Sequence, residues 1–193
     1  MNRKAFRRLA LAAVALFLVA YFASPLLTVR ALIAAAEQGD EATLERLVDF
    51  PAFRQSLKDE MNARLIAEMR SDLGGRDSAL RGLGMMLAPT LLSGAVDALV
   101  TPQAVAAMVR TAEAPDAKDV ARNRIDPTPE PAAETDRKES QVRRRYSYRG
   151  LNSVAVSLTR RDRPEERLDL LLERRGVFSW KLAGVDLPDT PAG

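Results

Sequence analysis

The sequence predicts an α+β fold in which an N-terminal transmembrane helix and a helical half precede a three- to four-stranded antiparallel sheet. Three observations lead to this prediction. An uncharged run, Leu9–Val29, is long enough at about 1.5 Å per helical residue to cross a hydrocarbon core about 30 Å thick. Apolar residues then recur at helical spacing as far as residue 112, and beyond residue 142 they alternate with polar residues, as in strands.

The apolar run is interpreted as an uncleaved signal anchor, with a cleaved signal peptide and a buried soluble helix as the alternatives. Cleavage after Ala23 would place Tyr21 at the third position before the cut, and cleavage after Ala20 would place Leu18 there. Cleavage sites have small residues at that position, so neither site fits. The bulky aromatic residues near the end of the run instead suit the interfacial belt of a membrane span.

The distribution of charge predicts how the anchor is oriented. Four basic residues precede the apolar run and the single Arg30 follows it, which places the N-terminus in the cytoplasm and the rest of the chain across the membrane. Of the 29 basic residues, 25 remain when those four are removed, against 26 acidic ones. The net charge of +3 therefore reflects topology and does not indicate nucleic acid as a partner. The four residues are Arg3, Lys4, Arg7 and Arg8.

The cytoplasmic tip and the anchor, residues 1–29, are followed by the predicted helical part of the domain, residues 30–113. Pro25 lacks the backbone N–H that a helix interior needs, so a break or kink is expected at Ser24–Pro25. Glycines and prolines mark the ends of the later helices. The expected helices are Thr28–Gln38, Asp40–Val48, Pro51–Leu73 and Thr101–Ala112.

Two further segments differ from their surroundings in composition. Gly82–Val96 carries no charge but contains glycine and proline, so it is too short and too interrupted to span a bilayer. It is interpreted as a kinked helical pair in the core, with an interfacial or ligand-pocket element as the alternative. Residues 114–141 combine prolines and charges with almost no large apolar side chains, and this composition predicts a flexible linker.

The C-terminal part, residues 142–188, is predicted to form an antiparallel sheet that belongs to the same domain. Leucines recur at every second position of Leu168–Leu172 and define one face of a strand, and Gly184 indicates a bulge in the last strand. The pattern leaves open whether the sheet packs on the helices or is separated from them by the linker. Residues 189–193 are expected to form a disordered tail.

Five short motifs carry a family resemblance. They are Tyr21–Pro25, Gly39–Asp40, Val48–Lys58, Val100–Pro102 and Phe178–Leu182. Through these motifs and their order, the chain resembles the bacterial domain-of-unknown-function family 2939 over nearly its whole length outside the linker. The resemblance implies a membrane-anchored bacterial protein without an established activity. With the orientation predicted from the charges, the anchor is expected in the inner membrane and the domain in the periplasm. The order of elements is also similar to cone-shaped folds of the nuclear-transport-factor-two-like and cystatin-like groups, which is a likeness of fold alone.

The chain contains no histidine and no cysteine. The commonest general base, the thiol nucleophile and the usual zinc ligands are therefore missing, and a Ser-His-Asp site cannot form. We predict no catalytic, cofactor-binding or metal-binding residue, and we expect no cofactor. Carboxylates remain as acid–base groups, but the most conspicuous one, Asp49 between two helices, is interpreted as a helix N-cap, like Asp40 and Thr101.

Two surfaces are candidates for binding. The first is a cleft between the apolar helices and the inner face of the sheet, for which a closed core is the alternative. Its predicted lining residues are Leu83, Met86, Leu87, Leu91, Phe178 and Trp180. The second is a basic strand surface that would contact anionic lipid headgroups, for which attraction between the basic sheet and the acidic helices is the alternative. It consists of Arg143, Arg144, Arg145, Arg149, Arg160, Arg161 and Arg163.

Together these features predict a membrane-anchored envelope protein that acts as a non-enzymatic binding or interaction module. Its expected partners are the lipid bilayer, through Leu9–Val29, and an envelope protein, whereas nucleic acid is not expected. Two alternatives stay open. One is an enzyme that uses carboxylates in the helix–sheet cleft, and the other is a module that contacts anionic lipid through the basic strand surface.

Overall fold

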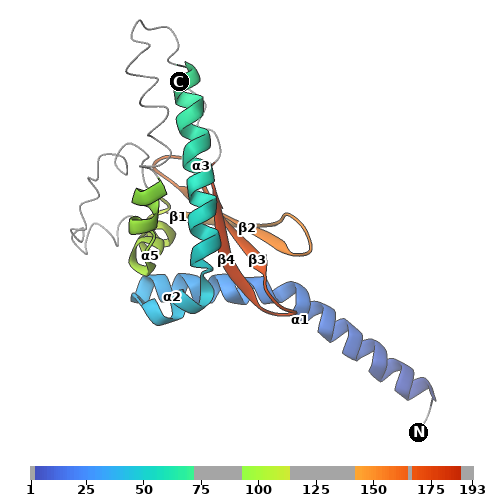
Figure 1. Ribbon diagram of the computed structural model, residues 1–193. Helices are drawn as coiled ribbons and strands as arrows, with labels where there is room; N and C mark the ends of the chain where they lie inside the picture. The colour runs from blue at the N-terminus through green and yellow to red at the C-terminus, as the bar shows by residue number, and fades with distance from the viewer. Residues whose placement is uncertain (1–2, 72–92, 114–141, 165–166, 188–193) are drawn as a thin grey trace, which may run out of the picture.

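The computed structural model describes residues 3–71, 93–113, 142–164 and 167–187. The first half is helical and a four-stranded antiparallel sheet follows, which confirms the predicted α+β fold (Figure 1). The predicted linker, 114–141, and the predicted tail, 189–193, lie outside the described residues. The elements are α1 Arg3–Gln38, α2 Glu41–Leu47, α3 Phe50–Ser71, a helical segment over 93–99, α5 Pro102–Thr111, β1 Val142–Tyr148, β2 Ser153–Arg160, β3 Arg167–Arg174 and β4 Trp180–Asp186.

The sheet is a meander with the strand order β1-β2-β3-β4, and each pair of neighbours is antiparallel. Its last pair contains an irregularity. Leu171 pairs with Gly184, whereas Leu172 pairs with Leu182, so Ala183 is the extra residue of a β-bulge. The bulge predicted from Gly184 is thereby confirmed.

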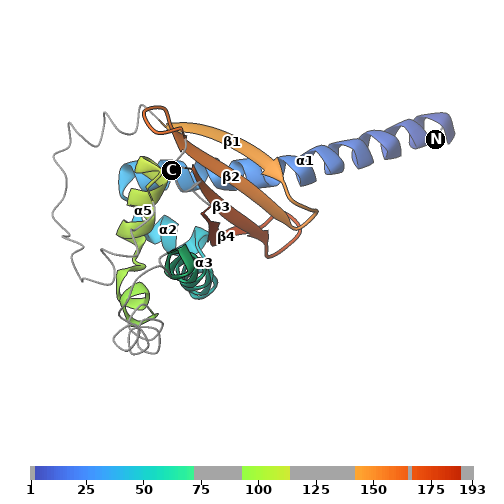
Figure 2. The ribbon, with the colours of Figure 1, turned by 90° about the horizontal axis from the view of Figure 1, so that it is seen from above.

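The helices pack directly on one face of the sheet, which resolves the question that the sequence leaves open (Figure 2). Val156 and Leu170 from that face belong to one cluster of buried residues with Phe53, Leu57 and Met61 from α3, and each of the five is at most 2% exposed. Residues of α1, α2 and α5 complete the cluster. Phe53, Leu57 and Met61 recur every four residues and form the buried apolar stripe of α3. The later positions of the stripe, at which no side chain is described, are Leu65, Met69 and Leu73.

The helix ends follow the predicted capping residues. Asp40 Oδ1 accepts a hydrogen bond from the Thr43 N–H at 3.0 Å, and this bonding lowers the pKa of the Asp40 carboxyl. Asp49 and Thr101 accept equivalent bonds at the starts of α3 and α5. Gly39, with φ of 67°, ends α1 in the left-handed region that glycine adopts without strain.

Helix α3 lies along the free edge of β4 and satisfies its backbone groups. Ser56 Oγ accepts a hydrogen bond from the Val185 N–H and donates one to the Val185 carbonyl, both at 3.0 Å. Glu60 Oε1 accepts from the Leu187 N–H at 3.1 Å. An unpaired strand edge is a template for aggregation, so α3 protects this side of the sheet.

The close approach of α3 to β4 requires glycine at position 184. A Cβ atom on Gly184 would lie 2.7 Å from Ser56 Oγ and 3.2 Å from Ser56 Cβ. Ser56 cannot rotate away without losing both of its hydrogen bonds to Val185.

Gly184→Ala is expected to lower the free energy of unfolding of the full-length chain by about 1–3 kcal/mol, because the added methyl group overpacks the contact with Ser56. Urea unfolding of the detergent-solubilised protein, followed by circular dichroism, measures this change. Gly94→Ala is the matched control, since nothing lies within 4 Å of a Cβ atom there and its segment is helical. No loss is expected for the control, and equal stability of the two variants would contradict the packing argument.

Candidate functional site

Helix α1 has an exposed apolar half and a buried half. Among the described residues it is the one helix long and apolar enough to cross a membrane, over Arg7–Gln38, and an N-terminal signal sequence would have the same properties. Leu16 is 71% exposed, whereas Val29 is 1% exposed. Burial begins at Ser24, so residues 24–29, which the sequence assigns to the anchor, already pack one side against the domain.

The helix continues through Pro25, and the expected break does not occur. Proline has no N–H to donate to the carbonyl of Tyr21, four residues earlier. Ser24 Oγ donates to that carbonyl at 2.8 Å instead, and the same oxygen accepts a hydrogen bond from Trp180 Nε1 at 2.8 Å. Ser24 is 4% exposed and Trp180 is 2% exposed. A buried chain of hydrogen bonds therefore keeps α1 intact where it meets β4.

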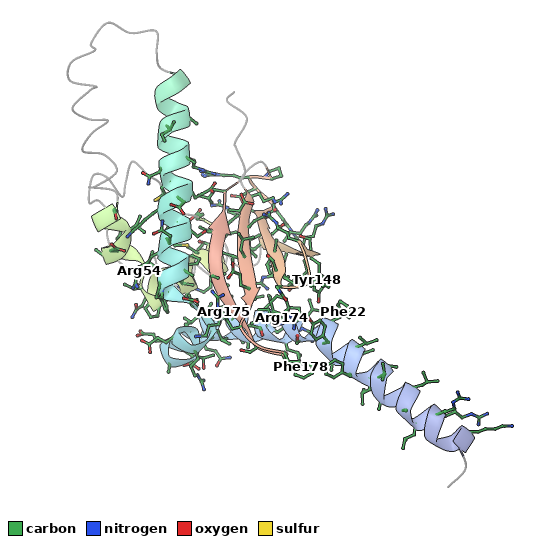
Figure 3. The ribbon with its side chains drawn as sticks, turned by 45° about the vertical axis from the view of Figure 1, so that its right-hand side comes forward. Phe22, Arg54, Tyr148, Arg174, Arg175 and Phe178 are labelled. Carbon is green, nitrogen blue, oxygen red and sulfur yellow. The ribbon has the colours of Figure 1, made fainter. Side chains whose placement is uncertain are left out.

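Arg174, the last residue of β3, links the β1–β2 turn and the β3–β4 turn to α1. Its guanidinium carbon lies 3.9 Å from the ring centroid of Tyr21 and 4.2 Å from that of Trp180, which is a cation–π arrangement. Arg174 Nε donates to the carbonyl of Leu151 at 3.2 Å, and Nη1 donates to the carbonyl of Val177. Figure 3 shows Arg174 between the end of the sheet and the helix.

Aromatic side chains of the sheet extend this junction along the exposed half of α1. Phe178 packs edge-on against Phe17, with 5.6 Å between the ring centroids. Tyr148 packs edge-on against Phe22 at 6.2 Å, and its hydroxyl donates a hydrogen bond to the Phe22 carbonyl (Figure 3). The sheet therefore contacts the helix well before the point at which the core begins.

The two described residues of the predicted cleft lie in different surroundings. Trp180 belongs to the closed core and hydrogen-bonds to Ser24. Phe178 is 48% exposed, in the turn before β4, and contacts α1. For Trp180, the structure agrees with the closed core that the sequence analysis gave as the alternative to a cleft. The other four predicted lining residues, which lie outside the described residues, are Leu83, Met86, Leu87 and Leu91.

The arginines predicted to form one basic surface are divided by the register of the sheet. Arg144 lies on the inner face and pairs with Glu37 at 3.3 Å. Arg143 and Arg145 alternate with it and project from the outer face. Because successive side chains of a strand point to opposite faces, these three neighbours cannot contact one flat surface together.

Three more of these arginines lie at the end of the sheet opposite the α1 junction. Arg160 is 6% exposed and pairs with both Glu113 and Asp162, and its hydrogen bonds lower the pKa of the Asp162 carboxyl. Arg161 and Arg163 are exposed in the β2–β3 turn. The whole length of β2 lies between Arg161 and Arg163 at this end and the turns that contact α1 at the other end.

The seventh arginine, Arg149, takes part in an ion-pair network on the outer face. It bridges Asp169, at 3.0 Å, and Asp186, at 2.7 Å, and Arg167 pairs with the same Asp169. The Asp169 side chain is 1% exposed. Burial raises the pKa of its carboxyl, but the hydrogen bonds from Arg167 and Ser157 and the nearby positive charges outweigh burial, and the pKa is lowered. The network neutralises a buried charge on the sheet.

A shallow groove of about 400 Å³ separates α3 from the outer side of β3 and β4. Its carboxylates are engaged: Asp59 accepts from Gln55 at 2.9 Å, Glu60 accepts from a backbone N–H of β4's end, and Glu173 pairs with Arg175 at 2.9 Å. Within the described residues no group of three acidic, histidine or cysteine side chains could hold a metal ion. The groove is lined by Ala52, Gln55, Ser56, Asp59, Glu60, Leu171, Glu173, Ala183 and Gly184.

Sequence reasoning does not single out this groove. The signal available for it is the pair Gln55 and Asp59, which lie one helical turn apart on the side of α3 away from its apolar stripe. Such a pair is common on solvated helices, so it carries no specific prediction. The Ser24–Trp180 contact has no local signal at all, because its two residues are 156 positions apart.

Comparison with known proteins places part of the chain in a family. The family model described as "Protein of unknown function (DUF2939)" matches residues 14–108. The matched range begins within the exposed half of α1 and ends within α5, so it includes the residues on either side of Pro25. No curated protein and no solved structure is significantly similar to the chain.

Ser24→Ala is expected to lower the free energy of unfolding by at least about 1–3 kcal/mol, because it leaves the Trp180 indole N–H and the Tyr21 carbonyl unsatisfied in a buried place. Urea unfolding followed by circular dichroism measures the loss. Ser147→Ala, at an exposed position of β1, is the control and is expected to be neutral. Trp180→Phe combined with Ser24→Ala should be less destabilising than the sum of the two single changes, and simple additivity would contradict the hydrogen-bond chain.

Proposed function

We propose that this chain, which belongs to the DUF2939 family of proteins of unknown function, is a single-pass, membrane-anchored binding module. The anchor is the exposed half of α1 in a bacterial inner membrane. The N-terminus lies in the cytoplasm and the α+β domain lies in the periplasm. The observation that carries the proposal is that one uninterrupted helix is apolar and exposed over its first half and packs one side into the domain core over its second half.

A continuous helix couples the domain to the bilayer rigidly. A flexible tether would let the domain swing, but here Val29 and Leu32 of α1 belong to the same core cluster as Phe53 and Leu170. Any tilt of the membrane helix therefore moves the whole domain. This favours a role in which the domain is held at a fixed height and orientation for a partner in the envelope.

Binding is favoured over catalysis by the chemistry of the side chains. The chain contains no histidine and no cysteine. The carboxylates of the groove are held by hydrogen bonds or ion pairs, and Asp169 is neutralised by two arginines. An enzyme that uses carboxylates in a helix–sheet cleft remains the alternative function, and it would need two carboxylates converging on one substrate position.

The groove between α3 and β4 is the surface that we propose for the partner. Its lining combines the small residues Ser56, Ala183 and Gly184 with three carboxylates. Small side chains admit a close-packed chain segment, and an acidic lining, here called the rim, favours positive charge. The proposed occupant is therefore a basic, extended segment of an envelope protein.

The anchor is tested by extraction of membranes with alkaline carbonate. The full-length chain is expected to stay in the membrane at its uncleaved mass, and an alkaline phosphatase fused to its C-terminus is expected to be active. Leu16→Arg should release a large part of the protein, because a charge at the centre of a span costs about 2.5–3.5 kcal/mol. Leu16→Phe is the control and should be retained. A shortened chain in the soluble fraction would contradict the anchor.

The groove is tested by a photo-crosslinking residue at Gln55 in intact cells. We expect one discrete adduct with an envelope protein, and we expect Asp59→Lys to reduce its yield several-fold because it reverses the charge of the rim. Glu45→Lys makes the same charge change on the exposed side of α2 and should leave the adduct unchanged. An adduct that is equally abundant in both variants would contradict recognition of a basic segment.

A further inference from the structure

The end of the sheet beside α1 exposes apolar side chains from two turns. In a four-stranded meander the β1–β2 and β3–β4 turns lie at the same end, and Figure 2 shows both on the side from which the exposed half of α1 projects. Leu151 in the first turn is 70% exposed, and Val177 and Phe178 in the second are 57% and 48% exposed. The turn at the opposite end, Arg161–Pro164, is made of charged residues and proline.

Side-chain contacts hold both turns against the exposed, apolar half of α1. Arg174 hydrogen-bonds to the carbonyls of Leu151 and Val177 while it stacks on Tyr21 (Figure 3). Phe178 reaches further and contacts Phe17, with 5.6 Å between the ring centroids. The turns cannot move away from α1 without breaking these contacts.

The part of α1 that is free of the domain is too short to span a bilayer by itself. At about 1.5 Å per residue, the helix rises about 24 Å from Arg8 to Ser24, where its burial begins, and about 14 Å from Arg8 to Phe17. A hydrocarbon core is about 30 Å thick. With Arg8 near the cytoplasmic boundary of that core, about 30 Å of helix ends near Thr28. The hairpin turns beside Phe17 and Tyr21 therefore lie on the lipid side of the outer boundary.

We infer that the two hairpin turns, residues 149–152 and 175–179, are immersed in the outer leaflet of the bilayer, so that lipid is the ligand of this end of the sheet. The inference rests on the proposed anchoring of α1. It assigns the exposed side chains of Leu151, Val177 and Phe178 to the bilayer rather than to a protein partner. These side chains continue the exposed apolar surface of α1, which the same lipid would surround.

The side chains around the turns suit an interface between lipid and water. Tyr21 and Tyr148 combine an apolar ring with a polar tip, and such residues form the aromatic belts of membrane proteins. The guanidinium of Arg174 is stacked on two rings and donates hydrogen bonds to two backbone carbonyls, and these contacts lower the cost of placing its charge near lipid. Three contacts with the bilayer, the helix and the two turns, would fix both the tilt and the rotation of the domain.

Because the chain contains no cysteine, a single introduced cysteine can be labelled at a chosen position. Single cysteines at Leu151, Val177, Leu16 and Pro164 are labelled with a nitroxide in the full-length chain, which is reconstituted into phosphatidylcholine vesicles with and without phosphatidylglycerol. The collision rate of each label with oxygen, which concentrates in lipid, is compared with that for a water-soluble nickel chelate. Emission of the single tryptophan, Trp180, reports that each labelled protein is folded.

We expect the oxygen-to-nickel ratio at Leu151 and Val177 to be several-fold higher than at Pro164, lower than at Leu16, and the same in both lipid mixtures. Replacing Val177 with Asn and Phe178 with Ser should lower the ratio at Leu151, because the pair of turns is then less apolar.

Two other outcomes would overturn the inference, and they differ from failure of the anchor. A lipid-exposed Leu16 with both turns in water would leave α1 anchored and refute the immersion of the turns. A turn signal that appears only with phosphatidylglycerol would indicate attraction through arginines instead of apolar insertion. A water-exposed Leu16 would refute the proposed anchoring itself.

Discussion

The architecture depends on one buried chain of hydrogen bonds, from the Trp180 indole to Ser24 Oγ and from Ser24 Oγ to the Tyr21 carbonyl. Pro25 removes a backbone donor from the middle of α1, and the Ser24 hydroxyl replaces it. Because Ser24 in turn accepts from Trp180, the integrity of the helix depends on the position of β4. The membrane-facing half of α1 and the sheet are thus parts of one rigid body, and Arg174 adds a second link at the same place.

The edges and the ends of the sheet differ in the side chains that they present. The free edge of β4 is closed by Ser56 and Glu60 of α3, so it does not offer a template for pairing. The opposite edge strand, β1, carries exposed Arg143 and Arg145, and charged side chains on an edge discourage pairing. The end with the β1–β2 and β3–β4 turns exposes the apolar side chains of Leu151, Val177 and Phe178 beside the ion-paired Arg149 and Arg175, whereas the described part of the β2–β3 turn, 161–164, exposes no large apolar side chain. A domain of this kind is suited to sit on a surface in one orientation.

Three of the seven arginines that the sequence assigns to a basic surface, Arg144, Arg149 and Arg160, are held in ion pairs. Asp169 is buried on the outer face and held ionised by Arg167 and Arg149. Arg160, which is nearly as buried, pairs with Glu113 and Asp162. Pairs of this kind leave little free charge for recognition, since breaking one would strand a buried ion. The apolar end and the acidic groove are therefore the better candidates for contact with other molecules.

The helical half, the antiparallel sheet, the caps at Asp40 and Thr101 and the bulge near Gly184 could all be predicted from local sequence patterns, because each depends on residues close together in the chain. The same patterns also indicated the apolar N-terminal helix. That α1 continues through Pro25 emerges from the tertiary structure, where the Ser24 hydroxyl that donates to the Tyr21 carbonyl is itself held by Trp180, 156 positions away. The tertiary structure likewise divided the arginines between faces and ends of the sheet and formed the groove beside Gly184. Those features arise from strand register and from contacts between distant elements, which no local period encodes.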